Sequence, residues 1–225
     1  MEFNIAIVIP VYKEQLSDNE ILSLKQCVKI FSGYTIYIVT HKELNLTEYY
    51  SINNSFKKKF FKKKFFKDIS GYNRLMLNIN FYKSFRKYEY ILIHQLDAFV
   101  FRNDLPKWIE KKFDYIGAPW KTISVNEELK LNYKVGNGGF SLRKTDSFIK
   151  VLKSFKFIYS FSFLMKRLKS KSKLCAFIYA IYFHFICNNF FFLLNRFDRN
   201  EDYFWSVFVP RKIKWFIIPP ANIAA

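Results

Sequence analysis

The sequence predicts an α/β protein with a doubly wound, mostly parallel sheet. Two observations lead to this fold class: short apolar runs typical of strands, and helical segments that alternate with them. Alternation of strands and helices is typical of such sheets, which bind ligands beyond the carboxyl ends of their strands. With 225 residues, 51% of them hydrophobic, the chain fits a single domain over residues 1–225.

The first unit is predicted to be a strand, a helix and a second strand. Residues 3–11 are a short apolar run with a proline near its end, and residues 34–39 are a run rich in β-branched and aromatic side chains. Between them, Ser17 can cap a helix that has Glu20 at its third position. Apolar residues follow at near-helical spacing: Ile21, Leu24, Val28 and Phe31. We expect a right-handed unit with parallel strands.

The alternation continues along the chain. Apolar positions predict a helix over residues 75–85, and residues 90–94 predict the next strand, which ends at Gln95-Leu96-Asp97. Further strands and helices are expected through residues 115–120 and 135–142. Asp97 is therefore placed at the carboxyl end of a strand, where this fold class binds its ligands.

Residues 56–67 are a low-complexity block of phenylalanine and lysine with no clean helical or strand period. Two interpretations stay open. The block could dock on anionic lipid or on an acidic acceptor. It could equally be a solvated surface excursion, since an AT-rich genome enriches both residue types.

The chain changes character over residues 154–195, which we expect to form a basic and aromatic helical insertion. Residues 166–173 are a basic cluster, and residues 175–195 carry no charge if His184 is neutral. Three interpretations stay open for this insertion. It could lie in the interface of an anionic leaflet, form an ordinary helical hairpin packed on the core, or span the membrane.

Composition limits the partners. The chain has 37 Lys and Arg against 18 Asp and Glu, a net charge of +19, which favours an anionic partner such as nucleic acid, a phospholipid surface or a nucleotide sugar. The three cysteines, Cys27, Cys175 and Cys187, show no Cys-x-x-Cys spacing. They suggest neither a disulfide framework nor a zinc site. A reducing cytoplasm is expected, because the N-terminus also lacks the pattern of a signal peptide.

Asp97 is the first candidate for chemistry. A carboxylate on a tight turn after a central strand can hold a divalent cation, and such a cation can neutralise a diphosphate leaving group. Mn²⁺ and Mg²⁺ often take their remaining ligands from water and phosphate oxygens. The alternative is that Asp97 only forms the turn or caps a helix.

Two further segments carry candidate chemistry. Glycines at 136, 138 and 139 permit positive φ and let a ligand approach the backbone, although a simple glycine turn into a strand fits as well. Glu201 and Asp202 open an apolar run, and one of them could take the proton of an acceptor hydroxyl. The alternative for this pair is to cap a helix.

Taken together and in order, these motifs resemble a bacterial family of GT-A-type sugar transferases of capsule and lipopolysaccharide biosynthesis, catalogued largely as a domain of unknown function. The segments that carry the resemblance are residues 9–13, 71–76, 81–82, 88–101, 114–120, 136–143 and 200–202. Residues 154–195 are not part of it, and the resemblance implies further residues beyond Ala225.

The resemblance implies a role for each matching position on the donor side. Asp97 would be the metal ligand, while Gln95 departs from the first acid of the Asp-x-Asp motif. Donor-binding positions would be Pro10, Val11, Tyr12, Asn73, Arg74, Gln95, Leu96, Gly138 and Gly139. The first three would hold base and ribose, the next two would face the phosphates, and the glycines would line the donor sugar and the acceptor cleft.

On the acceptor side, the resemblance implies that Trp120 stacks on the acceptor. Asp202 would be the catalytic base, with Glu201 as its substitute. The implied activity is transfer of a sugar from a UDP donor to a lipid-linked or surface-glycan acceptor, dependent on Mn²⁺ or Mg²⁺ and inverting. The expected location is the inner face of the cytoplasmic membrane, and no nucleic acid partner is expected.

Two other functions remain as alternatives. A sugar nucleotidyltransferase could share the scaffold, but it would need a glycine-rich phosphate loop after the first strand, which residues 10–14 do not supply. A non-enzymatic basic module that binds nucleic acid or membrane fits the charge. It leaves the segments around Asp97, Gly138 and Asp202 unexplained.

Overall fold

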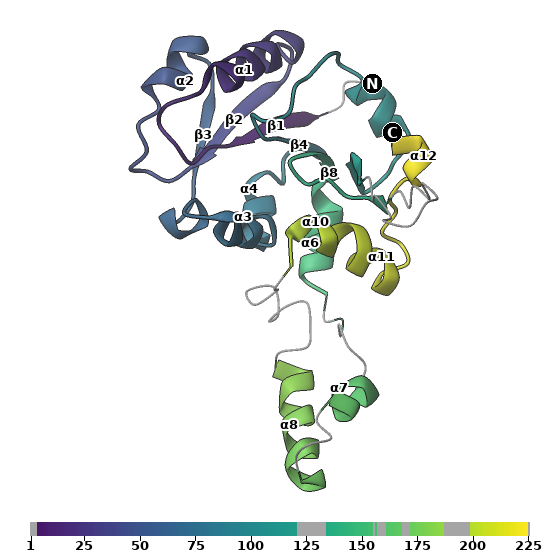
Figure 1. Cartoon of the computed structure of the whole chain (residues 1–225). Coiled ribbons are helices and arrows are strands. Elements are labelled where there is room, and N and C mark those ends of the chain that lie inside the picture. The colour runs from purple at the N-terminus through teal and green to yellow at the C-terminus, as the bar shows by residue number, and fades with distance from the viewer. Residues whose placement is uncertain are drawn as a thin grey trace, which may run out of the picture.

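The computed structural model describes residues 4–120, 134–154, 156, 161–167, 172–186 and 199–224 (Figure 1). Cys187 and the end of the uncharged stretch, residues 187–195, lie outside the described residues.

A six-stranded sheet forms the centre of the α/β body. Its strands, in spatial order, are β3 (Lys57–Phe60), β2 (Thr35–Thr40), β1 (Ile5–Pro10), β4 (Tyr90–His94), β8 (Phe140–Lys144) and β5 (Tyr115–Gly117). The first four are parallel, whereas β8 runs antiparallel to both β4 and β5. The prediction of a mostly parallel α/β sheet is confirmed, with one antiparallel strand inserted near its edge.

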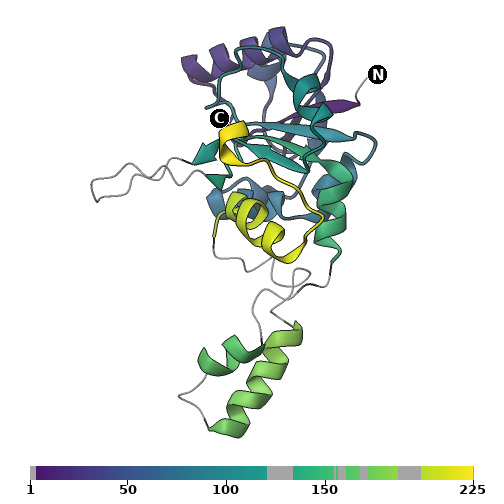
Figure 2. The same cartoon turned by 90° about the vertical axis from the view of Figure 1, so that its right-hand side faces the viewer.

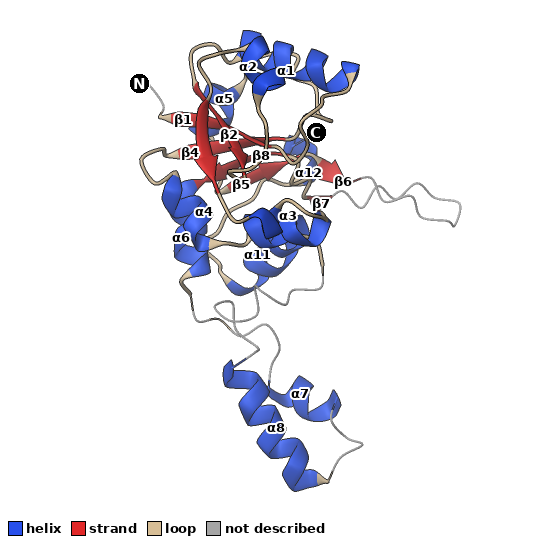
Figure 3. Cartoon of the chain, turned by 90° about the vertical axis from the view of Figure 1, so that its left-hand side faces the viewer, coloured by secondary structure: helices blue, strands red, loops and turns tan. Residues whose placement is uncertain are grey.

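Helices cover both faces of this sheet (Figure 3). One face carries α1 (Asp18–Ile30), α2 (Thr47–Ile52) and α5 (Leu105–Glu110). The other carries α3 (Ile69–Met76), α4 (Ile79–Ser84), α6 (Thr145–Leu152) and the helical run of α10 (Glu201–Tyr203), η3 (Phe204–Phe208) and α11 (Val209–Lys212). The remaining elements are η1 (Lys63–Phe65), α12 (Ala221–Ala224) and a small ladder of β6 (Pro119–Trp120) and β7 (Lys134–Val135).

Two apolar cores result, one on each face of the sheet. Alternate residues of β1 point to opposite faces, so Ile7 packs with Leu24 and Cys27 of α1, whereas Val8 packs with Tyr82 and its neighbours. All six residues of β1 are buried, as expected of a parallel strand covered on both sides. Residues 5–10 are apolar without interruption because both faces of β1 are covered.

The predicted opening unit is confirmed. Strands β1 and β2 are parallel neighbours joined through α1. The carboxylate of Glu20 accepts a hydrogen bond from the Ser17 backbone N–H (2.8 Å), as the capping pattern predicts, and a second one from the Ser17 hydroxyl (2.7 Å).

The single helix predicted over residues 75–85 is wrong in one respect, because the structure has two helices there. Helix α3 ends at Met76 and α4 begins at Ile79. Asn78 caps α4, and its side-chain oxygen accepts a hydrogen bond from the Asn80 N–H at 2.9 Å. The apolar residues still share one face, so periodicity alone could not locate the break.

The Phe-Lys block is also more ordered than its composition suggested. Residues 57–60 form the edge strand β3, paired with β2, while Phe56 and Phe65 are buried. Lys57 and Lys58 are exposed on this edge. Lysines on an edge strand oppose pairing with another chain, which gives this part of the block a structural role.

Within residues 154–195, a helical hairpin is formed by α7 (Phe161–Arg167) and α8 (Lys173–Ile186). The two helices pack on each other, and the two views in Figures 1 and 2 show them extending away from the α/β body. The hairpin therefore does not pack on the core of the sheet. Among the described residues, no helix has the length and apolar character that crossing a membrane requires.

The strand order defines where a ligand is expected. From β1 the chain moves outward through β2 and β3, and then returns to the other side of β1 to form β4. The order reverses between β1 and β4, and open α/β sheets bind ligands in the crevice at such a switch point. Strand β1 ends there at Pro10 and β4 at His94.

Candidate functional site

A cavity of about 570 Å³ opens beyond the carboxyl ends of β1 and β4. Most of the predicted site residues line it: Pro10, Val11, Tyr12, Asn73, Gln95, Leu96, Asp97, Gly138, Gly139, Glu201 and Asp202. Arg74 and Trp120 do not. The fold thus brings together residues that lie almost 200 positions apart in the sequence.

The loop after β1 forms one wall of the cavity. Tyr12 is 65% exposed, so one large aromatic side chain is available to a ligand. The loop is held by an ion pair between Lys13 and Glu20 (2.6 Å) and by the Tyr49 hydroxyl, which donates to the Lys13 carbonyl (2.8 Å). Lys13 and Lys67 also line the cavity, together with acids that include Glu20, Asp68 and Asp97.

The turn after β4 presents Asp97. His94 is buried, and one of its ring nitrogens, Nε2, lies 3.1 Å from the Ala98 carbonyl across the turn. Burial lowers the pKa of His94 to about 4, so the imidazole is neutral near pH 7 and serves to hold the turn. The Gln95 N–H donates to the Gly139 carbonyl at 2.8 Å, while Asp97 is exposed in the cavity.

The glycine segment, residues 136–139, packs against this turn. Its glycines were expected to adopt positive φ, but the structure gives another reason for them. No described glycine has a positive φ. Glycine is required for space instead, because a Cβ on Gly138 would overlap the Glu201 carboxylate, and one on Gly139 would lie 2.5 Å from Gln95 Oε1. Close packing between three separate segments therefore explains these glycines.

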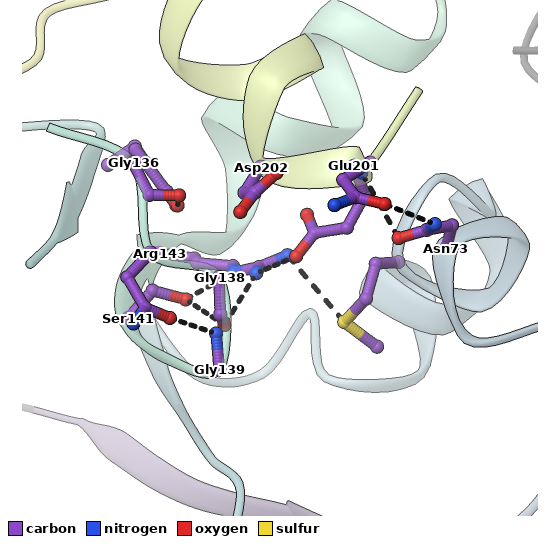
Figure 4. Close-up of polar contacts among 12 residues, drawn as sticks. Asn73, Gly136, Gly138, Gly139, Ser141, Arg143, Glu201 and Asp202 are labelled. Carbon is purple, nitrogen blue, oxygen red and sulfur yellow. Dashed lines mark hydrogen bonds and ion pairs between the residues drawn. The ribbon is translucent and has the colours of Figure 1, made fainter. Parts of the chain in front are cut away.

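A buried ion pair joins the glycine segment to α10 (Figure 4). Arg143 on β8 is fully buried and its Nη2 lies 2.8 Å from Glu201 Oε1, a carboxylate whose side chain is 2% exposed. The same guanidinium donates to the Gly138 carbonyl (3.1 Å), the Ser141 hydroxyl (2.9 Å) and the Tyr82 hydroxyl (2.8 Å). Burial raises the pKa of Glu201, and Arg143 opposes that shift.

The start of α10 carries both candidate acids. The side-chain oxygen of Asn73 accepts from the Glu201 N–H at 3.1 Å, and its amide donates to Asn200 at 3.2 Å, so Asn73 fastens α3 to α10. Asp202 is half-buried and its Oδ1 accepts from the Tyr203 N–H at 2.7 Å. Burial raises the pKa of Asp202, with the Tyr203 N–H as the main opposing contact.

The helix that follows Asp202 has an irregular turn. Residues 204–208 are π-helical, and Pro210 lies directly beyond them. Proline cannot donate to the preceding turn, and insertions of this kind are frequent at functional sites. The Ser206 hydroxyl donates to the Asp202 carbonyl at 2.7 Å, which holds the residue at the rim of the cavity.

Two buried polar atoms of cavity-lining residues have no hydrogen-bond partner in the described part of the chain. They are Glu201 Oε2 and the Tyr72 hydroxyl oxygen. Burial raises the pKa of Tyr72 and the Gln95 side chain opposes that shift, so the hydroxyl stays protonated. Buried polar atoms are costly when unpaired, so the two atoms are suited to a ligand that both donates and accepts hydrogen bonds.

Arg74 and Trp120 lie outside the main cavity. The Nε of Arg74 is buried with no hydrogen-bond partner in the described residues, and the residue lies outside the cavity. Trp120 lines a neighbouring recess together with Asp202 and Tyr203, and its ring stacks on Tyr203 at a centroid distance of 6.4 Å. Gly136 leaves room for the same indole.

Sequence reasoning missed Arg143, Tyr72 and Lys13. Each lies inside or next to a segment that was singled out, but an arginine in a strand and a tyrosine in a helix have more common explanations in surface or core packing. Only the three-dimensional contacts distinguish them.

The residues present fit one kind of metal site. The described residues contain no group of three or more His, Cys, Asp or Glu that could hold a metal ion by themselves. Asp97 and Asp202 both line the cavity, however. One or two carboxylates suit Mg²⁺ or Mn²⁺ when substrate phosphates and water complete the coordination.

Gly138→Ala should destabilise the protein by about 1–3 kcal/mol, because the added methyl group must displace the paired Glu201 carboxylate. Gly33→Ala is a matched control, since nothing lies within 4 Å of a Cβ built there. Urea unfolding of both variants measures the difference. Equal urea midpoints for the two variants would show that the contact between Gly138 and Glu201 adjusts to a methyl group at little cost.

A comparison with protein families supports one assignment. The family model described as "Protein of unknown function (DUF5672)" matches residues 55–225, about three quarters of the chain. The match includes Asp97, the glycine segment and the acids of α10, whereas β1 and Tyr12 precede it. No curated protein matches the chain. A match of this extent shows that the chain belongs to the DUF5672 family of proteins of unknown function.

Proposed function

We propose that this protein is a GT-A-type glycosyltransferase that moves a sugar from a UDP donor to a glycan or lipid-linked acceptor. The observation that carries the proposal is the cavity at the switch point between β1 and β4, which combines an exposed aromatic ring, a carboxylate on the β4 turn and a second, half-buried carboxylate.

The donor nucleotide would lie along the β1 wall. Tyr12 is exposed there, and a nucleobase can stack on its ring. Pro10 and Val11 complete this wall, while Lys13 and Lys67 provide positive charge near the phosphates. Asp97 would hold Mn²⁺ or Mg²⁺, which stabilises the charge that develops on the departing diphosphate.

Asp202 is the stronger of the two candidates for the base. One oxygen of Glu201 is already bonded to Arg143, whereas Asp202 is paired with no cationic side chain in the described residues. Asp202 would take the proton of the acceptor hydroxyl as that oxygen bonds to the anomeric carbon. The bond from this carbon to the diphosphate breaks on the opposite side, which inverts the configuration.

The unpaired atoms favour a sugar as the group beside α10. Glu201 Oε2 can accept a hydrogen bond from a hydroxyl group, and the Tyr72 hydroxyl can donate one. The diphosphate is better placed toward Asp97, where a bound Mn²⁺ or Mg²⁺ would offset its charge, and toward Lys67. The part of the cavity beside α10 therefore suits the sugar, and the part beside Tyr12 and Asp97 suits the nucleotide diphosphate.

The location that fits this activity is the inner face of the cytoplasmic membrane, with the protein bound peripherally. A lipid-linked acceptor is presented there, and the net charge of +19 favours an anionic leaflet. Nucleic acid is not part of the proposal, because the cavity pairs its positive charge with carboxylates.

A screen of nucleotide sugars by thermal shift, with and without Mn²⁺, tests this function, because a bound donor raises the melting temperature in proportion to its affinity. Asp97→Ala should abolish the Mn²⁺-dependent part of the shift. Asp146→Ala is the control, since Asp146 is exposed and does not line the cavity. A metal-dependent shift that persists in Asp97→Ala would remove the proposed metal ligand. Salt-sensitive binding of RNA without any donor binding would favour a non-enzymatic basic module.

A further inference from the structure

Helix α8 carries a row of exposed apolar side chains. Leu174 is 69% exposed and Ile178 59%, and Phe177, Ile181 and Tyr182 are exposed as well. Their spacing of three and four residues places them along one side of the helix, and Tyr179, which is 45% exposed, extends the apolar surface beyond that side. A contiguous apolar surface of this kind on a protein usually marks a binding site for another molecule or for a membrane.

Part of α8 packs on α7. Ala180 is fully buried. The rings of Phe161 on α7 and Phe177 on α8 are in edge contact at 6.0 Å between centroids, so Phe177 lies at the border of the exposed row that is next to α7. Figures 1 and 2 show the hairpin extending from the α/β body.

The charge of the sequence next to α8 favours an anionic bilayer as the partner. Five of the eight residues from 166 to 173 are lysine or arginine, and this stretch runs from the end of α7 to the first residue of α8, whereas residues 174–186 contain none. A helix with an apolar side next to a basic cluster is typical of proteins that lie in the interface of an anionic bilayer. A second copy of the chain would bring two basic clusters and two net charges of +19 together, which opposes dimerisation through this surface.

We propose that the apolar side of α8 inserts into the headgroup region of a bilayer that contains anionic phospholipid, which the positive charge of the chain favours. The inference rests on the peripheral location proposed above and names the surface responsible. It requires no sugar transfer, so it can fail or hold separately from the enzymatic proposal.

The test is sedimentation of the full chain with phosphatidylglycerol–phosphatidylcholine vesicles and with vesicles of phosphatidylcholine alone. The double variant Leu174→Glu/Ile178→Glu removes two side chains from the apolar side. Its matched control is Leu22→Glu/Phe101→Glu, which adds the same charge at two exposed apolar positions of the α/β body (58% and 81% exposed). Any effect of net charge is therefore equal in the two variants.

Wild type and control should bind the anionic vesicles alike, and the α8 variant should bind at least about tenfold more weakly, because burial of even one such side chain is worth that factor. Equal binding by the two variants would overturn the proposal, as would equal binding of wild type to both kinds of vesicle. Concentration-dependent dimerisation that the α8 variant abolishes would assign the surface to a second copy instead. Donor-dependent thermal shifts, recorded on the same variants without vesicles, report on the enzymatic proposal independently.

Discussion

Asp202→Asn is expected to lower kcat by about 10²–10⁴-fold, the usual contribution of a positioned general base. Asparagine keeps the shape of the side chain and can still accept the hydrogen bond from the Tyr203 N–H. It cannot take a proton. Donor affinity should therefore stay close to that of the wild type, so the loss appears in kcat rather than in binding.

The pH dependence provides a second measurement on the same residue. A base must be deprotonated, and burial raises the pKa of Asp202 above that of an exposed aspartate. Activity of the wild type should therefore fall, as the pH decreases, at a higher pH than an exposed aspartate would give. Loss of donor binding in Asp202→Asn, equal to the loss of turnover, would assign Asp202 to the metal or to the fold.

Arg143→Leu is expected to reduce the free energy of unfolding by about 3–5 kcal/mol, because it leaves the buried Glu201 carboxylate without its cation. Arg143→Leu/Glu201→Leu removes both charges and should recover much of this loss. Urea unfolding of the two single variants and the double variant gives the coupling between the residues. Arg86 and Asp146 form an exposed pair at 3.8 Å, and the same substitutions there should change stability little.

The sign of the pH effect follows from proton linkage. Without Arg143, burial and the negative charge of Asp202 both raise the pKa of Glu201, so the pKa of its carboxyl in the folded state rises further above the unfolded value. The folded variant then binds more protons than the unfolded chain, and its stability falls as the pH rises between these two values. Arg143→Leu should accordingly lose less stability near pH 4 than at pH 7. An unfolding free energy unaffected by pH in this range would contradict the burial of an unpaired carboxylate.

Much of the α/β fold is determined locally and was therefore predictable. The run in β1 is apolar at every position because both of its faces are covered, and Ser17 and Glu20 start α1 through contacts three residues apart. Interactions of this range leave a pattern in the sequence itself. Residues 57–60 left no such pattern, so the strand they form was not predicted. An edge strand rich in lysine has neither the alternation nor the apolar run of an inner strand.

The candidate site depends on both the sequence and the tertiary structure. The sequence determined which polar residues follow which strands, so Tyr12, Asp97 and Asp202 could be named as candidates. Only the tertiary structure decided which partners they have. The sequence alone does not pair Arg143 with Glu201, 58 positions apart, or seat Gly138 against that carboxylate. Long-range contacts of buried charge depend on how separate elements pack, and packing leaves no periodic signal along the chain.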